Sequence, residues 1–149
     1  MLQPVVIDGI RTPIGKLNGA MKDIQPEEIA AFLLQKICER SHLDIRLLDA
    51  VILGQAKQSS DQPNIARLAA LMTKFPLEVQ AYTVHRQCGS GMQAVQNAAQ
   101  EIMCGYADFV LAGGVESMSN AQYYLREARR GYACLLYTSD AADDLTRVD

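Results

Sequence analysis

The chain has 149 residues, of which 49% are hydrophobic and 21% charged, which is the composition of an ordinary globular domain. This composition excludes a disordered chain, a collagen and a coiled coil. The formal net charge of −3 and the absence of Trp argue against a nucleic-acid partner, because phosphates call for basic surface and bases for stacking side chains.

The N-terminal sequence and the pattern of histidines and cysteines indicate where the protein is located and whether it binds a metal. Residues 1–8 carry no basic region, so they do not form a secretory signal, and no window of about 18 apolar residues predicts a membrane span. We therefore expect a cytoplasmic protein with no membrane partner. With two histidines and no CxxC pair, we expect no metal site. The four cysteines are widely separated: Cys38, Cys88, Cys104 and Cys134.

The first predicted elements are a strand and a long helix. Three β-branched residues at positions 5–7 predict a buried strand over residues 4–10. Pro26 and the two glutamates after it suit a helix N-terminus, because Pro fits the first turn and acidic side chains favour that end of the helix dipole. The helix is predicted to end near residue 40. One wide apolar stripe runs along it: Ile29, Ala30, Leu33, Leu34, Ile37 and Cys38.

Strands and helices alternate along the rest of the chain. Asp44 is placed to cap a single helical turn through Leu48. A strand at residues 107–112 is expected to be buried on both faces. The other predicted segments are strands at residues 49–54 and 79–84, a polar loop at 55–64, a helix at 65–72, and a helix at 90–105 with Met92, Val95, Ala99 and Met103 on one face. This alternation predicts an α/β fold built from parallel βαβ units.

The segment from Val84 to Ala94 is the most informative in the chain. It predicts the end of a strand, a turn that contains Cys88, and the start of a helix. The first N–H groups of that helix and its dipole would favour the thiolate of Cys88 over the thiol. Gly89 and Gly91 leave room for a substrate to reach the backbone. The turn also lies at the carboxyl end of a parallel strand, where open α/β sheets bind ligands.

These features favour a nucleophilic cysteine that forms a thioester or similar adduct. The alternative is a small buried cysteine, the usual state of a free thiol in a protein. Cys38 and Cys104 fall on apolar helical stripes, so we expect both to lie in the core.

At these residues the sequence resembles the N-terminal part of the thiolase family, which contains acetyl-CoA acetyltransferases and 3-ketoacyl-CoA thiolases. The resemblance covers residues 4–132 and implies a thiolase-like layered α/β fold, of which this chain holds the first half only. His85 departs from the family, which usually has Asn, Ser or Thr there, and we interpret it as a tolerated variant. Four ordered motifs carry the resemblance: Arg11-Thr12-Pro13-x-Gly15-Lys16, Pro63-Asn64-Ile65-Ala66-Arg67, Cys88-Gly89-Ser90-Gly91 followed by Gln93-Ala94, and Gly113-Gly114-Val115-Glu116-Ser117-Met118-Ser119.

The resemblance implies a reversible two-step acyl transfer with Cys88 as the nucleophile. Cys88 attacks the 3-keto carbon of a 3-ketoacyl-CoA, acetyl-CoA leaves, and CoA takes the acyl group from Cys88; the reverse reaction is a Claisen condensation. CoA and acyl-CoA are substrates, and no further cofactor is implied. In the family, the bases and oxyanion donors come from loops downstream of the residues present here, so we expect the chain by itself to be inactive.

The resemblance also implies assembly. We expect the complete protein to be a homodimer or homotetramer, with the contact made by residues 79–84 and 55–64. A half-domain exposes apolar surface that its missing half would cover, so we also expect the chain by itself to aggregate.

The tail departs from the family after residue 132. We interpret residues 1–133 as an incomplete thiolase N-terminal domain and residues 134–149 as a separate tail. Back-translated from Cys134, the tail fits TGT CTC TTA TAC ACA TCT GAC GCT GCC GAC, which resembles a transposase sequencing adapter read as coding sequence. We therefore interpret the tail as an assembly artefact; a natural divergent tail is the alternative.

Several other residues have a structural interpretation beside a functional one. We expect His42 to be solvated or to end a helix rather than to bind a ligand. Glu116 is expected to hold a loop rather than to act as an acid or base. The Gly113-Gly114 pair lacks the dinucleotide-binding pattern, which disfavours NAD. Three arginines are expected to form a solvated surface cluster rather than to contact CoA phosphates: Arg126, Arg129 and Arg130.

Two alternatives to a thiolase stay open. A condensing enzyme of the ketoacyl-synthase type shares the fold, although the motifs at Arg11–Pro13 and Glu116–Ser119 favour a thiolase. The other alternative is a non-catalytic lipid-carrying or oligomerisation module on a thiolase scaffold. The intact turn around Cys88 argues against such a module, and the sequence downstream of residue 133 in the source DNA would decide between them.

Overall fold

The computed structural model describes residues 2–126 and residue 128. These residues form an α/β fold, as the sequence predicts. Two short 3₁₀ turns, Ile45–Leu47 and Met118–Asn120, accompany the regular elements. The regular elements are, in chain order, α1 (Pro26–Ser41), β1 (Ala50–Gly54), α2 (Ile65–Leu71), β2 (Gln80–Val84), α3 (Ser90–Cys104) and β3 (Val110–Gly114).

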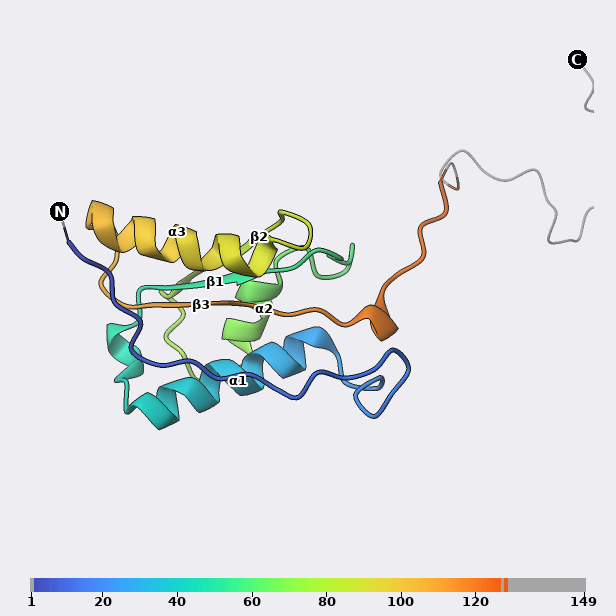
Figure 1. The fold of residues 1–149 in the computed structure, drawn as a ribbon, viewed down its shortest axis with the longest axis horizontal. Helices are drawn as coiled ribbons and strands as arrows, with labels where there is room; N and C mark the ends of the chain where they lie inside the picture. Colours follow the sequence, from blue (N-terminus) through green and yellow to red (C-terminus); the bar gives the residue numbers. More distant parts are fainter. Residues whose placement is uncertain (1, 127, 129–149) are drawn as a thin grey trace, which may run out of the picture.

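The sheet has three parallel strands in the order β2-β1-β3. Gly54, the last residue of β1, lies opposite Val84 of β2 and Gly114 of β3, so all three strands end at one edge of the sheet. Figure 1 shows the segments that follow the three strands at that same end of the molecule. The predicted parallel βαβ units are thereby confirmed, because parallel neighbours require a crossover connection.

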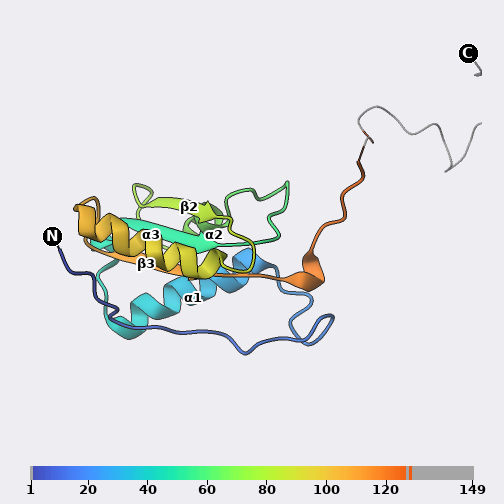
Figure 2. The same cartoon turned by 45° about the horizontal axis from the view of Figure 1, so that its top comes forward.

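Helices cover both faces of the sheet (Figures 1 and 2). α3 lies on one face, α2 lies on the other, and α1 packs on α2 as an outer layer. The side chains of β1 alternate between these layers: Val51 and Leu53 join the cluster with α1 and α2, whereas Ile52 packs with Ala94 of α3. The central strand is buried on both faces for this reason.

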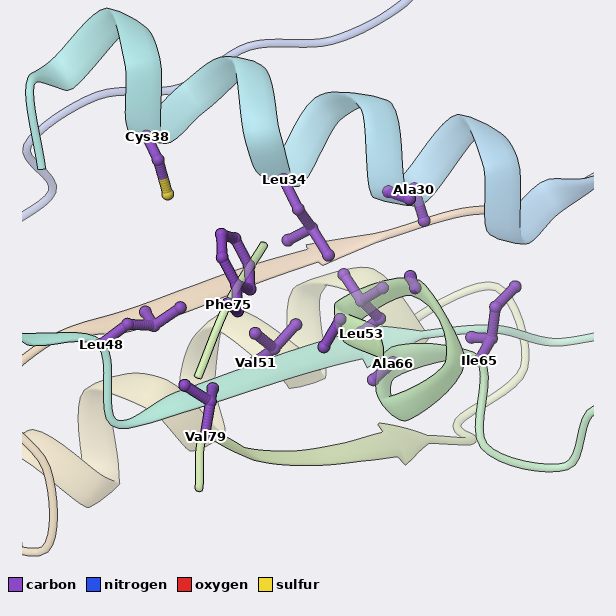
Figure 3. Packing of buried hydrophobic residues seen from close by; sticks show 13 residues of the cluster. Ala30, Leu34, Cys38, Leu48, Val51, Leu53, Ile65, Ala66, Phe75 and Val79 are labelled. Carbon is purple, nitrogen blue, oxygen red and sulfur yellow. The ribbon is translucent and has the colours of Figure 1, made fainter. Parts of the chain in front are cut away.

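The larger hydrophobic cluster lies between β1, α2 and α1 (Figure 3). Val51 and Ile65 have no exposed surface in it, and burial of each such side chain contributes about 1.5 to 3 kcal/mol. α1 adds residues of the predicted stripe: Ala30, Leu34 and Cys38 are buried, and Figure 3 shows Leu34 and Cys38 pointing toward the sheet. The prediction of α1 and of its apolar face is therefore confirmed.

The strand predicted for residues 4–10 is wrong. These residues form no strand, and Val5, Val6 and Ile7 are 72%, 85% and 70% exposed. The sequence had the β-branched pattern, but a strand needs a hydrogen-bonded neighbour, and no described strand pairs with this segment. It lies alongside α1 in both cartoons, and there Arg40 forms an ion pair with Asp8.

Two predicted faces are also wrong. β3 begins at Val110 rather than at residue 107, and its residues are half-buried or exposed rather than buried on both faces. On α3 three residues of the predicted apolar face, Met92, Val95 and Met103, are exposed, and the fourth, Ala99, is half-buried. The helix contacts the sheet through small residues instead, because small side chains let it approach closely: Ser90, Ala94 and Ala98.

Candidate active site

Cys88 lies in the short turn between β2 and α3, which we call the nucleophile turn (residues 85–89). β2 ends at Val84 and α3 begins at Ser90, so the thiol stands just before the N-terminus of α3 at the carboxyl edge of the sheet. The predicted placement of Cys88 is confirmed. Cys88 is exposed, which excludes the alternative of a small buried cysteine in this chain.

The hydroxyl of Ser90 holds the nucleophile turn closed. It accepts a hydrogen bond from the backbone N–H of Arg86 at 2.8 Å and donates one to the carbonyl of Gln87 at 2.6 Å. Backbone bonds from Gly89 N–H to Arg86 O at 3.0 Å and from Ser90 N–H to Gln87 O at 3.1 Å complete the turn. Ser90 is only 3% exposed, so these bonds are shielded from water.

Gln87, the residue before Cys88, has a left-handed backbone with φ of 48°. A residue with a Cβ adopts this conformation at a cost of about 1 to 3 kcal/mol, and it persists only where the surroundings fix it. Here the two Ser90 hydrogen bonds supply that constraint. Strain of this kind is often found at functional sites, where it helps to aim a side chain.

Two glycines at strand ends let α3 begin directly on the sheet. Gly54 ends β1, Gly114 ends β3, and Gly91 lies in the first turn of α3. A Cβ on Gly114 would come within 3.1 Å of the Cα of Gly91 and 3.3 Å of the carbonyl oxygen of Gly54. Glycine is therefore required at Gly114 for close packing of helix and sheet, a role that was not foreseen from the sequence, whereas a Cβ on Gly91 would meet nothing nearer than 3.6 Å.

His85 faces the loop that follows β1. Its Nδ1 lies 3.2 Å from the carbonyl oxygen of Gln55. A carbonyl only accepts, so this contact requires the proton on Nδ1 and leaves Nε2 as an acceptor in the neutral ring. His85 thus links the nucleophile turn to the loop at residues 55–64.

Glu116 holds that loop, as the sequence analysis expected. Its carboxylate accepts hydrogen bonds from the backbone N–H of Ala56 at 2.8 Å and of Lys57 at 3.3 Å. Two further residues of the same segment bind the loop and were not found from the sequence. The side chain of Gln122 contacts Ser60 and Asp61, and the hydroxyl of Tyr124 donates to the carbonyl of Gln58 at 2.8 Å.

The structure describes some of the remaining candidate residues, and others lie outside its described part. His42 ends α1 as its C-cap with φ of 53°, which confirms the helix-end interpretation. Cys38 is buried, as expected, and its burial raises the pKa of its thiol. The expectation that Cys104 lies in the core is wrong: the thiol is exposed at the end of α3, on a face that nothing described covers. Three predicted residues lie outside the described part of the chain: Arg129, Arg130 and Cys134.

Among residues 2–126 and 128, no cluster of three or more His, Cys, Asp or Glu side chains could hold a metal ion. No helix in this described part is both long and apolar enough to cross a membrane. The exposed thiol of Cys88, in a strained and well-anchored turn, is a group that can carry covalent chemistry.

Comparison with known proteins identifies the family of the chain. The family model described as thiolase, N-terminal domain, matches residues 4–148. The boundary expected at residue 133 stays a prediction, and the tail after it lies outside the described residues.

Individual relatives give the same result. A 3-oxoadipyl-CoA/3-oxo-5,6-dehydrosuberyl-CoA thiolase of Escherichia coli is 40% identical over 135 residues, which cover 89% of this chain and 34% of that protein. A probable acetyl-CoA acyltransferase of Staphylococcus epidermidis is 39% identical over 149 residues, 98% of this chain and 38% of that protein.

A solved structure also superposes well. The crystal structure of the Bacillus anthracis acetyl-CoA acetyltransferase has a TM-score of 0.79 and 43% identity over 87% of this chain and 32% of that one. The chain thus spans about a third of the length of these relatives. With the family model, the relatives and the fold in agreement, this chain belongs to the thiolase family and covers its N-terminal part.

Proposed function

We propose that Cys88 is the acyl-carrying nucleophile of an acyl-CoA C-acyltransferase, and that this chain supplies the N-terminal part of that enzyme. The observation that carries the proposal is the exposed thiol of Cys88 just before the N-terminus of α3, at the carboxyl edge of a parallel sheet. The names of the relatives, thiolase and acetyl-CoA acyltransferase, support the reaction class.

The reaction proceeds in two steps, acyl transfer to Cys88 and then acyl transfer from Cys88 to CoA. The sulfur of Cys88 forms a bond to C3 of a 3-ketoacyl-CoA, and the bond between C2 and C3 then breaks with its electron pair left on C2. C2 takes a proton and acetyl-CoA departs, which leaves the shortened acyl group on Cys88 as a thioester. The thiolate of CoA then attacks that thioester, releases an acyl-CoA and restores the thiolate of Cys88. Run backward, the same steps join two acyl-CoA molecules.

The described residues supply the nucleophile and its geometry. The left-handed backbone of Gln87 and the buried hydroxyl of Ser90 fix the turn, so the thiol is positioned before substrate arrives. The reaction also needs a base for the thiol, an acid/base group for C2 and donors for the oxyanion. We propose that these groups come from downstream sequence and that the chain by itself does not turn over.

The complete protein is proposed to act as a homodimer or homotetramer without any cofactor other than its CoA substrates. β2 is an edge strand of the described sheet, which supports a subunit contact along residues 79–84 and the neighbouring loop at 55–64. A cytoplasmic location remains part of the same proposal.

The test is to find the acyl group on Cys88. Residues 1–132 are joined to the downstream sequence of the source gene, the purified protein is incubated with acetyl-CoA, and the acetylated peptide is located by mass spectrometry. We expect acetyl transfer to the peptide that contains Cys88 and none to the peptide that contains Cys104, which is also an exposed thiol and serves as an internal control. Acetylation of Cys104 alone, or of neither cysteine, would contradict the proposal and favour a non-catalytic module.

A further inference from the structure

A line of polar side chains runs along the edge where α3 meets β2. Gln93, Asn97 and Glu101 are spaced four residues apart, so they share one face of α3. Tyr82 of β2 lies against the far end of this line, and Arg86 of the nucleophile turn lies against the near end. Figure 2 shows β2 beside α3, the arrangement that lets one line contact both elements.

Four hydrogen bonds connect these five residues. An Nη atom of Arg86 donates to Oε1 of Gln93, and Nε2 of Gln93 donates to Oδ1 of Asn97 at 2.8 Å. Nδ2 of Asn97 then donates to the hydroxyl of Tyr82 at 3.4 Å, and that hydroxyl donates to Oε1 of Glu101 at 2.7 Å. We call this set the α3 relay.

The groups at the two ends of the α3 relay determine which atom donates and which accepts in each of its hydrogen bonds. A carboxylate only accepts, so the hydroxyl of Tyr82 must donate to Glu101 and is left to accept from Asn97. Each amide in turn must present its NH₂ group toward Glu101 and its oxygen toward Arg86. A guanidinium only donates, so Arg86 is the group that fits the open oxygen of Gln93. Every member is thus oriented by its neighbour, and hydrogen bonds in such a chain strengthen one another.

The backbone of Arg86 also takes part in the hydrogen bonds that close the nucleophile turn. Its backbone N–H donates to Ser90, and its carbonyl accepts from Gly89, so the peptide groups on either side of Arg86 are part of the turn that contains Cys88. Displacement of the Arg86 side chain would therefore act directly on the strained backbone of Gln87.

We propose that Arg86 is a positioning residue for Cys88, and that Glu101 sets the position of Arg86 through Tyr82, Asn97 and Gln93. This inference rests on the proposed function, in which Cys88 is the nucleophile. Its first test uses the reactivity of Cys88 in the chain as it exists and does not require turnover.

The rate of alkylation of Cys88 by iodoacetamide, followed by peptide mass spectrometry, is measured in three variants. Arg86→Met is expected to slow the reaction about fivefold or more, because the turn loses its side-chain anchor. Arg86→Lys keeps one donor for Gln93 and is expected to restore the rate to within about twofold of the wild type. Tyr82→Phe removes only a hydroxyl, which contacts Glu101 at the end of the relay away from Arg86. It is expected to slow the reaction by less than Arg86→Met does.

The decisive comparison is the double variant of Tyr82→Phe and Arg86→Met. If both changes break one chain of contacts, the double variant reacts at the rate of Arg86→Met alone. Arg46→Met is the matched control, since Arg46 is an exposed arginine that pairs with Asp44 outside the relay, and it should leave the rate unchanged. The alkylation rate of Cys104 in the same samples should also stay constant, and thermal unfolding verifies that each variant is folded.

Three results would overturn the inference: a wild-type rate in Arg86→Met, failure of Arg86→Lys to restore the rate, or a full additional effect of Tyr82→Phe in the double variant. In the completed enzyme, Arg86→Met is expected to lower kcat and to leave KM unchanged, whereas a change in KM alone would count against positioning. A completed wild type without turnover would refute the proposed function, and the alkylation pattern would still decide the role of Arg86.

Discussion

Gly54 at the end of β1 lies so close to Ser90 that a Cβ on Gly54 would stand 2.2 Å from the carbonyl carbon of Ser90 and 2.4 Å from the nitrogen of Gly91. These are backbone atoms, which cannot turn aside as a flexible side chain can. The contact brings the N-terminus of α3 down onto the sheet, and it thereby places Cys88 at the carboxyl edge.

Gly54→Ala is therefore expected to destabilise the fold by about 2 kcal/mol or more, because the helix must move away from the strand. The measurement is urea unfolding followed by circular dichroism. Gly9→Ala is the matched control, since a Cβ on Gly9 meets nothing within 4 Å and should change the free energy of unfolding very little. Equal stability of the two variants would show that α3 does not depend on this contact.

Ser90→Ala is expected to cost about 1 to 3 kcal/mol, because it leaves the N–H of Arg86 and the carbonyl of Gln87 without their hydroxyl partner. Ser41→Ala is the control: that hydroxyl bonds only carbonyls of its own helix, Ile37 O at 2.7 Å and Cys38 O at 3.4 Å. Its loss should cost less, since such bonds contribute little to a helix. Urea unfolding gives both values, and a smaller loss in Ser90→Ala than in Ser41→Ala would contradict the role assigned to Ser90.

The three described free cysteines are expected to differ in reactivity. Burial, with a smaller contribution from the Glu39 carboxylate, raises the pKa of the Cys38 thiol above its ordinary 9.0, so the native protein should protect Cys38 from iodoacetamide. Cys88 and Cys104 are exposed and should react in the native state. Peptide mass spectrometry at increasing times measures all three, and native alkylation of Cys38 at the rate of Cys104 would contradict this packing.

The same shift gives a pH dependence at high pH. Because the pKa of Cys38 is higher in the folded state than in the unfolded state, folding favours the neutral thiol. Its contribution to stability is complete below the unfolded value near 9.0 and is lost as the pH rises through the folded value. The free energy of unfolding should therefore fall more steeply above that pH in the wild type than in Cys38→Ala. Parallel pH profiles would refute the assignment.

Asp44 gives the opposite pH dependence. Hydrogen bonds from the side chain and then from the backbone of Arg46 lower the pKa of Asp44 from 3.8 to about 2. Because the folded value lies below the unfolded one, the contribution of Asp44 to stability is present above the unfolded value and is lost as the pH falls through about 2. Carboxyl NMR titration should give that midpoint, and Arg46→Met should move it back toward 3.8. A wild-type midpoint near 3.8 would contradict the ion pair.

Most of the fold follows from local patterns in the sequence. The stripe from Ala30 to Cys38 predicts both the span and the buried face of α1, and the run before Gly54 predicts the central strand, because these patterns are satisfied by neighbours within the chain. The segment at residues 4–10 has an equally clear pattern but forms no strand, since it has no described strand beside it. A pattern typical of a strand thus forms a strand only where a neighbouring strand is present to pair with it.

The faces of α3 show why packing was harder to predict. Large apolar residues such as Met92 and Met103 mark a face of the helix, but they do not identify the neighbour that covers it. The face that meets the sheet is formed by Ala94 and Ala98, whose small size carries no periodic signal. The wrong expectation that Cys104 is buried has the same cause, because it was inferred from the helix face that turned out to be exposed.

The position of Cys88 could be predicted from the sequence, but most of the contacts that hold the nucleophile turn and the neighbouring loop could not. A cysteine between a strand and a helix predicts the placement of Cys88. The left-handed backbone of Gln87 is held by two hydrogen bonds of one neighbouring side chain, Ser90, which no residue pattern in the sequence indicates. The close approach of Gly114 to Gly54 and Gly91 joins residues far apart in the chain. The hydrogen bond that the hydroxyl of Tyr124 donates to the carbonyl of Gln58 likewise joins residues 66 positions apart.

The most direct test of the central claim is turnover by the completed protein. Residues 1–132 joined to the downstream sequence of the source gene are assayed by loss of the acetoacetyl-CoA enolate absorbance in the presence of CoA, beside Cys88→Ala, Cys104→Ala and the 149-residue chain alone. We expect turnover in the completed wild type and in Cys104→Ala, and none in Cys88→Ala or in the chain alone, because removal of one member of a catalytic set costs orders of magnitude in rate. Full activity in Cys88→Ala, or turnover by the chain alone, would contradict the assignment of the chemistry to Cys88.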